Sequence, residues 1–206
     1  MSQDSFKSYI LKKFNISFND ESLLTEALTQ RNYLNEHPDE KGRDYQRLEF
    51  LGDSVMQMIV AEYLFKRYPD WHEGQLTEMR IAMVQTRSFA HFSRMVHLNE
   101  GIRLGKGEEM SGARDRDSLL EDIWEAFIGA LYLDQGADVV RQFLNQTLFA
   151  AIDTDFLIVL LILKADYKSD YRPKGLWILI IRPKKRNNYQ IIPNYLKRVS
   201  PLMTKN

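Results

Sequence analysis

The sequence predicts an all-α fold that is followed by a short irregular basic tail. Apolar residues between Ser5 and Phe149 recur every three or four positions, and this spacing is typical of amphipathic helices. No stretch before Phe156 shows the two-residue alternation of a strand. Two of the predicted helices are apolar on nearly every side, which indicates that they lie at the centre of a domain.

The first part of the chain contains two short helices and a loop. Ser5–Phe14 carries aromatic and aliphatic residues on one side. Glu21–Thr29 follows Asp20, which is a residue type that caps helix N-termini. The stretch Asn35–Arg43 is polar and contains Pro and Gly, so we predict a loop there.

A long helix comes next and is followed by two more. Asp44 is placed to cap the long helix, which ends at Tyr68 because the residue before a proline disfavours helical backbone. A second helix runs from Gly74 to Val84, and a third covers Arg87–Val96.

The remaining elements before Phe156 are a loop and two helices. Leu98–Asp117 holds four glycines and many charged residues, so we predict a long loop. Ser118–Leu133 is a strongly apolar helix that Gly136 ends, and Ala137–Phe149 forms the last clear helix.

Charge divides the chain into two segments. Residues 1–156 carry 17 Lys and Arg against 26 Asp and Glu, whereas residues 157–206 carry 11 against 2. Such asymmetry indicates different roles for the two parts. We therefore predict a catalytic domain over residues 1–156 and a basic tail over residues 157–206. Within the tail, ILII at Ile178–Ile181 is a candidate strand and RPKKRNN at Arg182–Asn188 a basic turn or solvated arm.

Composition also limits the class of protein. The chain has no cysteine, which excludes disulfides and thiolate metal sites. The first residues do not form a signal peptide, and the longest apolar run, Leu157–Leu163, is too short to span a bilayer. We expect a soluble cytoplasmic protein that does not bind membranes.

Two pairs of carboxylates stand out because they lie within the two apolar helices. Glu49 and Asp53 are four residues apart, and Asp122 and Glu125 are three residues apart, so each pair shares one face of its helix. A single pair of this kind is more often a solvated helix face. Two pairs in apolar helices favour a site, because buried like charges are unfavourable unless something compensates them.

A divalent cation is the simplest compensation for four converging carboxylates. Oxygen ligands of this type select Mg²⁺, and Mn²⁺ can substitute. A bound ion of this kind can activate water for hydrolysis of a phosphodiester. A di-iron carboxylate site is the alternative, but it requires Glu-x-x-His motifs. None of the four histidines stands three residues after a glutamate.

Several motifs resemble the ribonuclease III family. QRLEFLGDS at Gln46–Ser54 resembles the family signature, and LLEDIWEAFIGALYLDQG at Leu119–Gly136 resembles its second motif. EGQLTEMR at Glu73–Arg80, LGKGE at Leu104–Glu108 and ALTQRNY at Ala27–Tyr33 are also similar to family sequence. The resemblance covers roughly residues 5–149 and is specific, since the motifs occur in the family's order and spacing.

The resemblance implies the ribonuclease III helical fold and a Mg²⁺-dependent endoribonuclease that cuts double-stranded RNA. The products would carry 5′-phosphate and 3′-hydroxyl ends, and the substrates would include ribosomal and messenger RNA precursors. The family's metal-binding carboxylates map onto Glu49, Asp53, Asp122 and Glu125. Asp53 and Glu125 would be the catalytic pair that is most sensitive to mutation.

The same resemblance implies a homodimer with two sites along one valley. Phe50 would enter a pocket of the partner subunit, although an ordinary core role is equally compatible with the sequence. Glu73 would support the cleft, or simply favour a helix N-terminus through its charge. Gln46 would also support the cleft, but it stands where the family usually has glutamate. Glu121 replaces the usual alanine, and its helical direction lets it face solvent.

The tail departs furthest from the family pattern. ADYKS at Ala165–Ser169 resembles the opening of a double-stranded RNA-binding domain, and the similarity then stops. We therefore predict a degenerate or truncated RNA-binding region that contributes electrostatic attraction at most. Two alternative functions remain open from the sequence: a non-cleaving double-stranded RNA-binding protein on the same fold, and an accessory subunit that dimerises with an intact relative.

Overall fold

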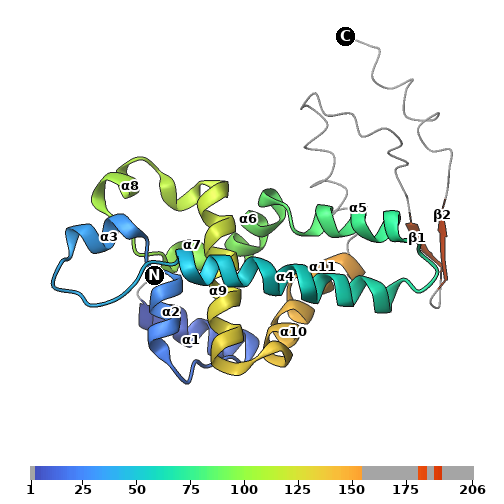
Figure 1. The fold of residues 1–206 in the computed structure, drawn as a ribbon, viewed down its shortest axis with the longest axis horizontal. Coiled ribbons are helices and arrows are strands. Elements are labelled where there is room, and N and C mark those ends of the chain that lie inside the picture. The colour runs from blue at the N-terminus through green and yellow to red at the C-terminus, as the bar shows by residue number, and fades with distance from the viewer. Residues whose placement is uncertain (1–2, 155–180, 185–187, 192–206) are drawn as a thin grey trace, which may run out of the picture. The chain divides into compact units, whose positions relative to one another are not determined.

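The predicted helices form an all-α domain in the computed structural model, which describes residues 3–154, 181–184 and 188–191 (Figure 1). The chain divides into two compact units, Met1–Ile162 and Leu163–Asn206. The helices of the first unit are α1 Gln3–Phe14, α2 Glu21–Ala27, α3 Arg31–Glu36, α4 Gln46–Arg67, α5 Glu73–Met83, α6 Thr86–Met95, α7 Leu98–Gly101, α8 Lys106–Met110, α9 Asp117–Gln135, α10 Ala137–Gln146 and α11 Leu148–Thr154, with a 3₁₀ turn η1 at Ala113–Asp115.

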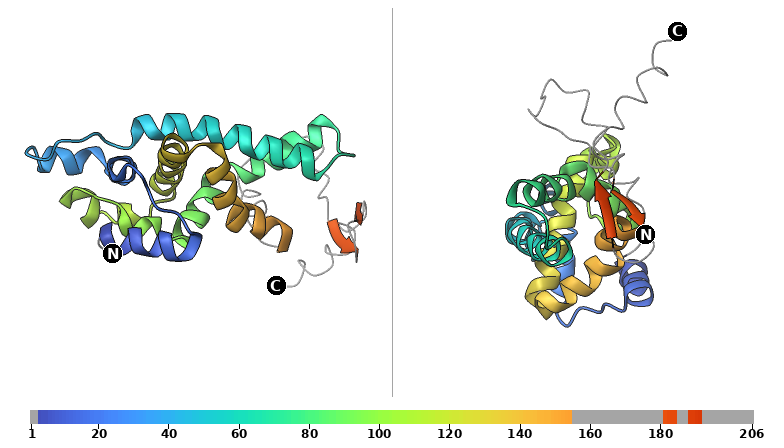
Figure 2. Two further views of the ribbon diagram at one scale, coloured as in Figure 1. Left: turned by 90° about the horizontal axis from the view of Figure 1, so that it is seen from below. Right: turned by 90° about the vertical axis from the view of Figure 1, so that its right-hand side faces the viewer.

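Helix α9 forms the centre of the domain. From Leu119 to Leu131 every residue is buried except the acids Glu121, Asp122 and Glu125, and α2, α4, α6 and α10 all pack against this helix. Figure 2 shows α4 along one side of the domain and α1 on the opposite side. Trp124 of α9 is fully buried, and its ring lies 5.6 Å from that of Phe143 and 5.9 Å from that of Phe92. The core is therefore organised around the helix that carries one carboxylate pair.

The residues predicted to cap helices act at three of the helix ends. The Asp20 carboxylate accepts a hydrogen bond from the backbone N–H of Ser22 at the start of α2. Asp44 accepts one from the N–H of Gln46, the first residue of α4. Gly136 ends α9 with a φ of 82°, in the region that glycine adopts without steric strain. Asp44 and Gly136 thereby mark the start of α4 and the end of α9, the two helices that carry the carboxylate pairs.

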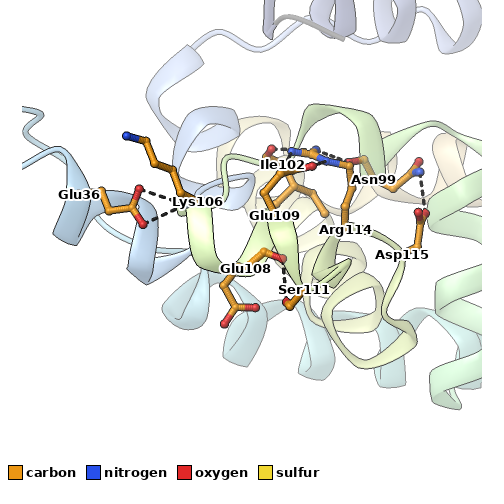
Figure 3. Close-up of polar contacts among 9 residues, drawn as sticks. All are labelled: Glu36, Asn99, Ile102, Lys106, Glu108, Glu109, Ser111, Arg114 and Asp115. Atoms are coloured by element: carbon orange, nitrogen blue, oxygen red, sulfur yellow. Dashed lines mark hydrogen bonds and ion pairs between the residues drawn. The ribbon is translucent and has the colours of Figure 1, made fainter.

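The prediction of a long loop over Leu98–Asp117 is wrong, because the structure contains α7, α8 and η1 there. Arg114 organises this segment (Figure 3). Its Nη1 donates to the carbonyl oxygens of Asn99 and Ile102 at 2.7 and 3.0 Å, and its Nε and Nη2 hold the two carboxylate oxygens of Glu109. One guanidinium group thereby joins all three short elements.

Two other boundaries also differ from the sequence prediction. The polar stretch predicted as a loop from Asn35 begins inside α3, whose last residue is Glu36. The backbone N–H of Lys106 donates to both carboxylate oxygens of Glu36, at 2.9 and 3.0 Å. This shared hydrogen bond holds α3 against the start of α8 (Figure 3). The helix predicted at Ala137–Phe149 is broken at Thr147, whose backbone leaves the helical region and separates α10 from α11.

Helix α4 is not buried on every side, contrary to the expectation from its apolar sequence. Phe50 is 79% exposed, and Phe65 and Met58 are exposed as well. These three residues lie within about 80° of one another around the helix axis, at 100° per residue. The fold therefore leaves an apolar stripe on α4, which we call the Phe50 stripe.

The described part of the second unit is a two-stranded antiparallel sheet. Strand β1 (Ile181–Lys184) pairs with β2 (Asn188–Ile191), and Ile181 lies opposite Ile191. The candidate strand at Ile178–Ile181 thus overlaps β1 only at Ile181, since residues 178–180 lie outside the described part. The ends of the basic run Arg182–Asn188 belong to the strands rather than to a turn. In the part of the chain that the structure describes, no helix combines the length and apolar character needed to cross a membrane.

Candidate active site

Helices α4 and α9 cross at two glycines that let their backbones touch. A Cβ atom built on Gly52 would lie 1.8 Å from the backbone oxygen of Glu125, and one built on Gly129 would lie 2.2 Å from the backbone oxygen of Leu48. Real Cβ atoms do not approach so closely, so only glycine fits at both positions. This contact brings the carboxylate pairs of the two helices to the same crossing.

The structure brings together the four carboxylates that the sequence singled out. Glu49, Asp122 and Glu125 are partly buried at the crossing, while Asp53 is more exposed. Burial raises the pKa of Glu125 to about 8, with further contributions from the charges of Asp53, Glu121, Glu49 and Asp122. The charges that raise the pKa of Glu125 are thus those of the other three predicted carboxylates and of Glu121, the residue before Asp122.

Glu49 is perturbed in the same direction. Burial raises its pKa to about 7, and the charge of Asp122 is the largest of the contributions from neighbouring carboxylates. Burial also raises the pKa of Asp122, against the opposing effects of a hydrogen bond from Tyr45 and the charge of Arg116. Carboxylates that resist ionisation in this way favour a cation that neutralises them.

Two residues that the sequence prediction did not assign to the site contact its carboxylates. The Tyr45 hydroxyl donates to Oδ2 of Asp122 at 2.9 Å, and Nε2 of Gln57 donates to Oδ1 of Asp53 at 3.3 Å. A sequence signal was available, because Tyr45, just before α4, and Asp53 and Gln57 within it are spaced at intervals of four residues from Glu49.

The prediction that Glu121 faces solvent is wrong. Its side chain is partly buried and accepts a hydrogen bond from Oγ1 of Thr86 at 3.1 Å, so it is directed towards α6. Its charge contributes to the raised pKa of both Glu49 and Glu125. Glu121 is therefore a fifth carboxylate beside the four that were predicted.

Three other predicted site residues lie at the margins of the cluster or away from it. Gln46 is exposed at the first position of α4, one turn before Glu49. Phe50 is exposed on the Phe50 stripe next to Glu49. Glu73 begins α5, beyond the opposite end of α4, where it accepts a hydrogen bond from Thr77. Within one chain, the structure does not bring Glu73 to the carboxylates.

The chemistry of the cluster fits a hard divalent cation. Its side chains supply carboxylate oxygens, the ligands that Mg²⁺ and Mn²⁺ prefer. Among the described residues, no three His, Asp or Glu side chains are already arranged as a metal site. The two helices thus bring the donor residues to one crossing. Binding of a metal ion would require their side chains to turn towards it.

Comparisons with known proteins agree with this architecture. A family model described as "Ribonuclease-III-like" matches residues 20–152, which include all four carboxylates. A protein from Leuconostoc mesenteroides named "Ribonuclease 3" is 91% identical over 175 residues, covering 85% of this chain and 74% of that protein. The chain belongs to the ribonuclease III family.

Further ribonuclease III relatives support the membership. "Ribonuclease 3" from Oenococcus oeni is 69% identical over 160 residues, which cover 78% of this chain and 68% of that protein. The nuclease domain of ribonuclease III from Campylobacter jejuni, solved at 2.2 Å, is 31% identical with a TM-score of 0.62, and the match covers 72% of this chain and 95% of that one. A second structure of the same domain is 33% identical with a TM-score of 0.61, and the match covers 67% of this chain and 93% of that one. That structure is described as flexible in a region involved in dimer formation.

Proposed function

We propose that this chain is an endoribonuclease that hydrolyses phosphodiester bonds of double-stranded RNA, leaving 5′-phosphate and 3′-hydroxyl ends. The observation that carries the proposal is the carboxylate cluster at the α4–α9 crossing, in a chain of the ribonuclease III family. Ribosomal and messenger RNA precursors are the expected substrates. Retention of all four carboxylates argues against the non-cleaving and accessory alternatives.

Glu49, Asp53, Asp122 and Glu125 would hold Mg²⁺, or Mn²⁺ in its place. The bound ion would neutralise the cluster and supply an activated water for attack on phosphorus. The residues' own role is to present oxygen ligands at the edge of a partly buried crossing, where electrostatic interactions are stronger than in bulk water. Asp53 is the most exposed of the four, so it would lie nearest to the sugar-phosphate backbone of an approaching RNA.

Arg116 is placed to meet the RNA beside these acids. Its charge acts on Asp122, and its side chain is 52% exposed at the start of α9. Nη2 of Arg116 donates to Glu108 at 3.3 Å, which orients the guanidinium group. Arginine binds phosphate through several N–H groups, so we assign Arg116 to the phosphate backbone. Contacts of this type carry no base information, and we expect little sequence preference.

The Phe50 stripe supports a homodimer. A phenylalanine that is 79% exposed is an unfavourable feature for an isolated domain, and exposed apolar surface marks interaction sites. The stripe lies on the same helix as Glu49 and Asp53, so pairing two copies through it would place two carboxylate clusters near one another. Glu73 would reach a cleft only in such an assembly.

The domain assignment and the role of the basic tail remain part of this proposal. We assign residues 1–156 to catalysis and residues 157–206 to a degenerate or truncated RNA-binding region. The excess of positive charge in the tail would attract phosphate in a salt-dependent manner. We expect the protein to act in the cytoplasm.

Cleavage of a long RNA duplex tests the proposal directly. The protein, Glu125→Gln and the control Glu78→Gln, which changes an exposed acid on α5, are compared with Mg²⁺ and with a chelator. We expect metal-dependent cutting by the protein and the control, and none by Glu125→Gln. A folded wild-type protein that does not cut at low salt and high concentration would refute the proposed activity.

A further inference from the structure

Tyr45 makes a hydrogen bond to a carboxylate of the site from a buried position. The residue immediately precedes α4, and only 8% of it is exposed. Its hydroxyl donates to Oδ2 of Asp122, on α9, at 2.9 Å. The bond therefore links the start of one carboxylate-bearing helix to a side chain of the other.

The backbone of Tyr45 is itself held by a network of hydrogen bonds. Its N–H donates to the carbonyl oxygen of Thr29 at 3.0 Å, and the N–H of Arg103 donates to the carbonyl oxygen of Leu28 at 2.7 Å. The guanidinium group of Arg103 also donates to the Thr29 hydroxyl at 3.2 Å. Because Thr29 is buried, this network gives Tyr45 a fixed position.

A fixed donor determines how the Asp122 carboxylate is oriented. An aspartate side chain rotates about two bonds, and a hydrogen bond to one oxygen restricts both rotations. The bond occupies Oδ2 and leaves Oδ1 to face a ligand. Partners of this kind behind a ligating carboxylate tune metal sites in proteins generally.

We propose that Tyr45 is a positioning residue that holds Asp122 in the orientation in which it binds the divalent cation. The proposal rests on the proposed function, since it assumes that the cluster binds a metal ion. It goes further by assigning a role to a residue that is not itself a ligand. Tyr45 acts through Asp122 and has no contact with the reacting phosphate.

A purely structural role for Tyr45 predicts a different result. If its hydroxyl only satisfied its own hydrogen-bonding need, then Tyr45→Phe would lower the melting temperature and leave metal affinity unchanged. The chain offers a matched control, because the Tyr33 hydroxyl also donates to a carboxylate, Oε1 of Glu40, at 2.8 Å. Tyr33→Phe removes the same type of bond from α3 without altering a carboxylate of the cluster.

Calorimetric titration of the full chain with Mn²⁺ tests the proposal. We expect Tyr45→Phe to weaken Mn²⁺ binding by about 10- to 100-fold, the usual effect of removing such a partner, and Tyr33→Phe to leave it unchanged. In duplex cleavage, raising the metal concentration should restore the rate of Tyr45→Phe. Unchanged Mn²⁺ affinity in a folded Tyr45→Phe would overturn the positioning role.

A double-variant comparison tests separately whether Tyr45 acts through Asp122. Asp122→Asn and the double variant with Tyr45→Phe are titrated in parallel. If Tyr45 acts through Asp122, the second substitution adds no further loss of affinity, whereas an additional loss of tenfold or more would overturn the proposal. A wild-type protein that binds no Mn²⁺ would refute the proposed function itself, and the positioning role with it.

Discussion

Substitution of Gly52 by alanine adds one methyl group at the α4–α9 crossing. It tests whether the backbone contact there sets the distance between the carboxylate pairs. In Gly52→Ala, the new Cβ atom would lie 1.8 Å from the backbone oxygen of Glu125. The shortest real contacts of such atoms are 3.0 Å, so the α4 and α9 backbones must separate by about 1.2 Å. The atom that the new Cβ would meet belongs to the backbone, which cannot rotate away as the end of a side chain can.

Two effects follow from this separation. Overpacking of this kind destabilises proteins by about 1–3 kcal/mol, partly offset by the roughly 1 kcal/mol that alanine gains over glycine in a helix. The net loss is then at most about 2 kcal/mol, which corresponds to a fall in melting temperature of up to about 8 °C for a chain of this size. A displacement of about 1 Å between catalytic groups can reduce the rate by roughly 100-fold.

Thermal unfolding and duplex cleavage measure the two effects separately. Gly107→Ala is the matched control, because a Cβ atom on Gly107 of α8 would meet no atom within 4 Å. We expect the control to keep the wild-type melting temperature and rate. If Gly52→Ala retained both as well, then the backbone contact would not set the distance between the carboxylate pairs, and the reasoning would fail.

Three further predictions concern pH, assembly and the segment around Arg114. Burial and like charges raise the pKa of Glu125 from 4.5 to about 8, so between these values the folded state keeps a proton that the unfolded state loses. Stability in chelator should fall as pH rises through this range, and thermal unfolding should show a smaller fall for Glu125→Gln. Phe50→Arg should yield monomers by sedimentation without loss of monomer stability, since Phe50 is already exposed. Arg114→Ala should speed proteolysis within residues 98–117, because four hydrogen bonds are lost.

Each of these predictions has a control and a contradicting outcome. Added Mg²⁺ should flatten the pH dependence of the wild-type protein, and a stability that rises with pH in chelator would contradict the assignment of the raised pKa. Phe65→Arg tests whether the whole stripe pairs, and a dimer that survives Phe50→Arg would exclude Phe50 from the interface. Lys106→Ala is the control for Arg114→Ala, since Lys106 contacts Glu36 through its backbone. Equal proteolysis of the two variants would argue against the role of Arg114.

The helices and the four carboxylates could be predicted from the sequence because both depend on local spacing. Apolar periodicity marks the buried face of a helix, and residues three or four apart share that face. Asp20 and Gly136 were recognisable for the same reason, since a cap acts on neighbouring backbone. Apolar periodicity could not show that α4 would leave Phe50 exposed, because exposure depends on which elements cover the helix, and only the family resemblance placed Phe50 at a subunit contact.

The prediction failed where contacts between distant residues decide the structure. The charged, glycine-rich stretch around Arg114 has the composition of a loop, but a single guanidinium group orders it into short helices. Glu121 was placed in solvent by its angle around an isolated helix, whereas Thr86 of α6 holds it beside the site. Neither contact produces a periodic pattern in the sequence, because the residues that it joins lie on different structural elements.

The backbone contact at Gly52 explains why the four acids form one site. Apolar burial of α9 and the paired glycines fix the crossing, so the carboxylates are brought together whether or not an ion is present. The raised pKa of Glu125 follows first from its burial at this crossing and then from like charges that the packed helices cannot move apart. A cluster built in this way would favour a cation, because the fold has already brought its carboxylate side chains to one crossing. Tyr45 adds what the backbone cannot supply, namely a fixed orientation for one of the four side chains.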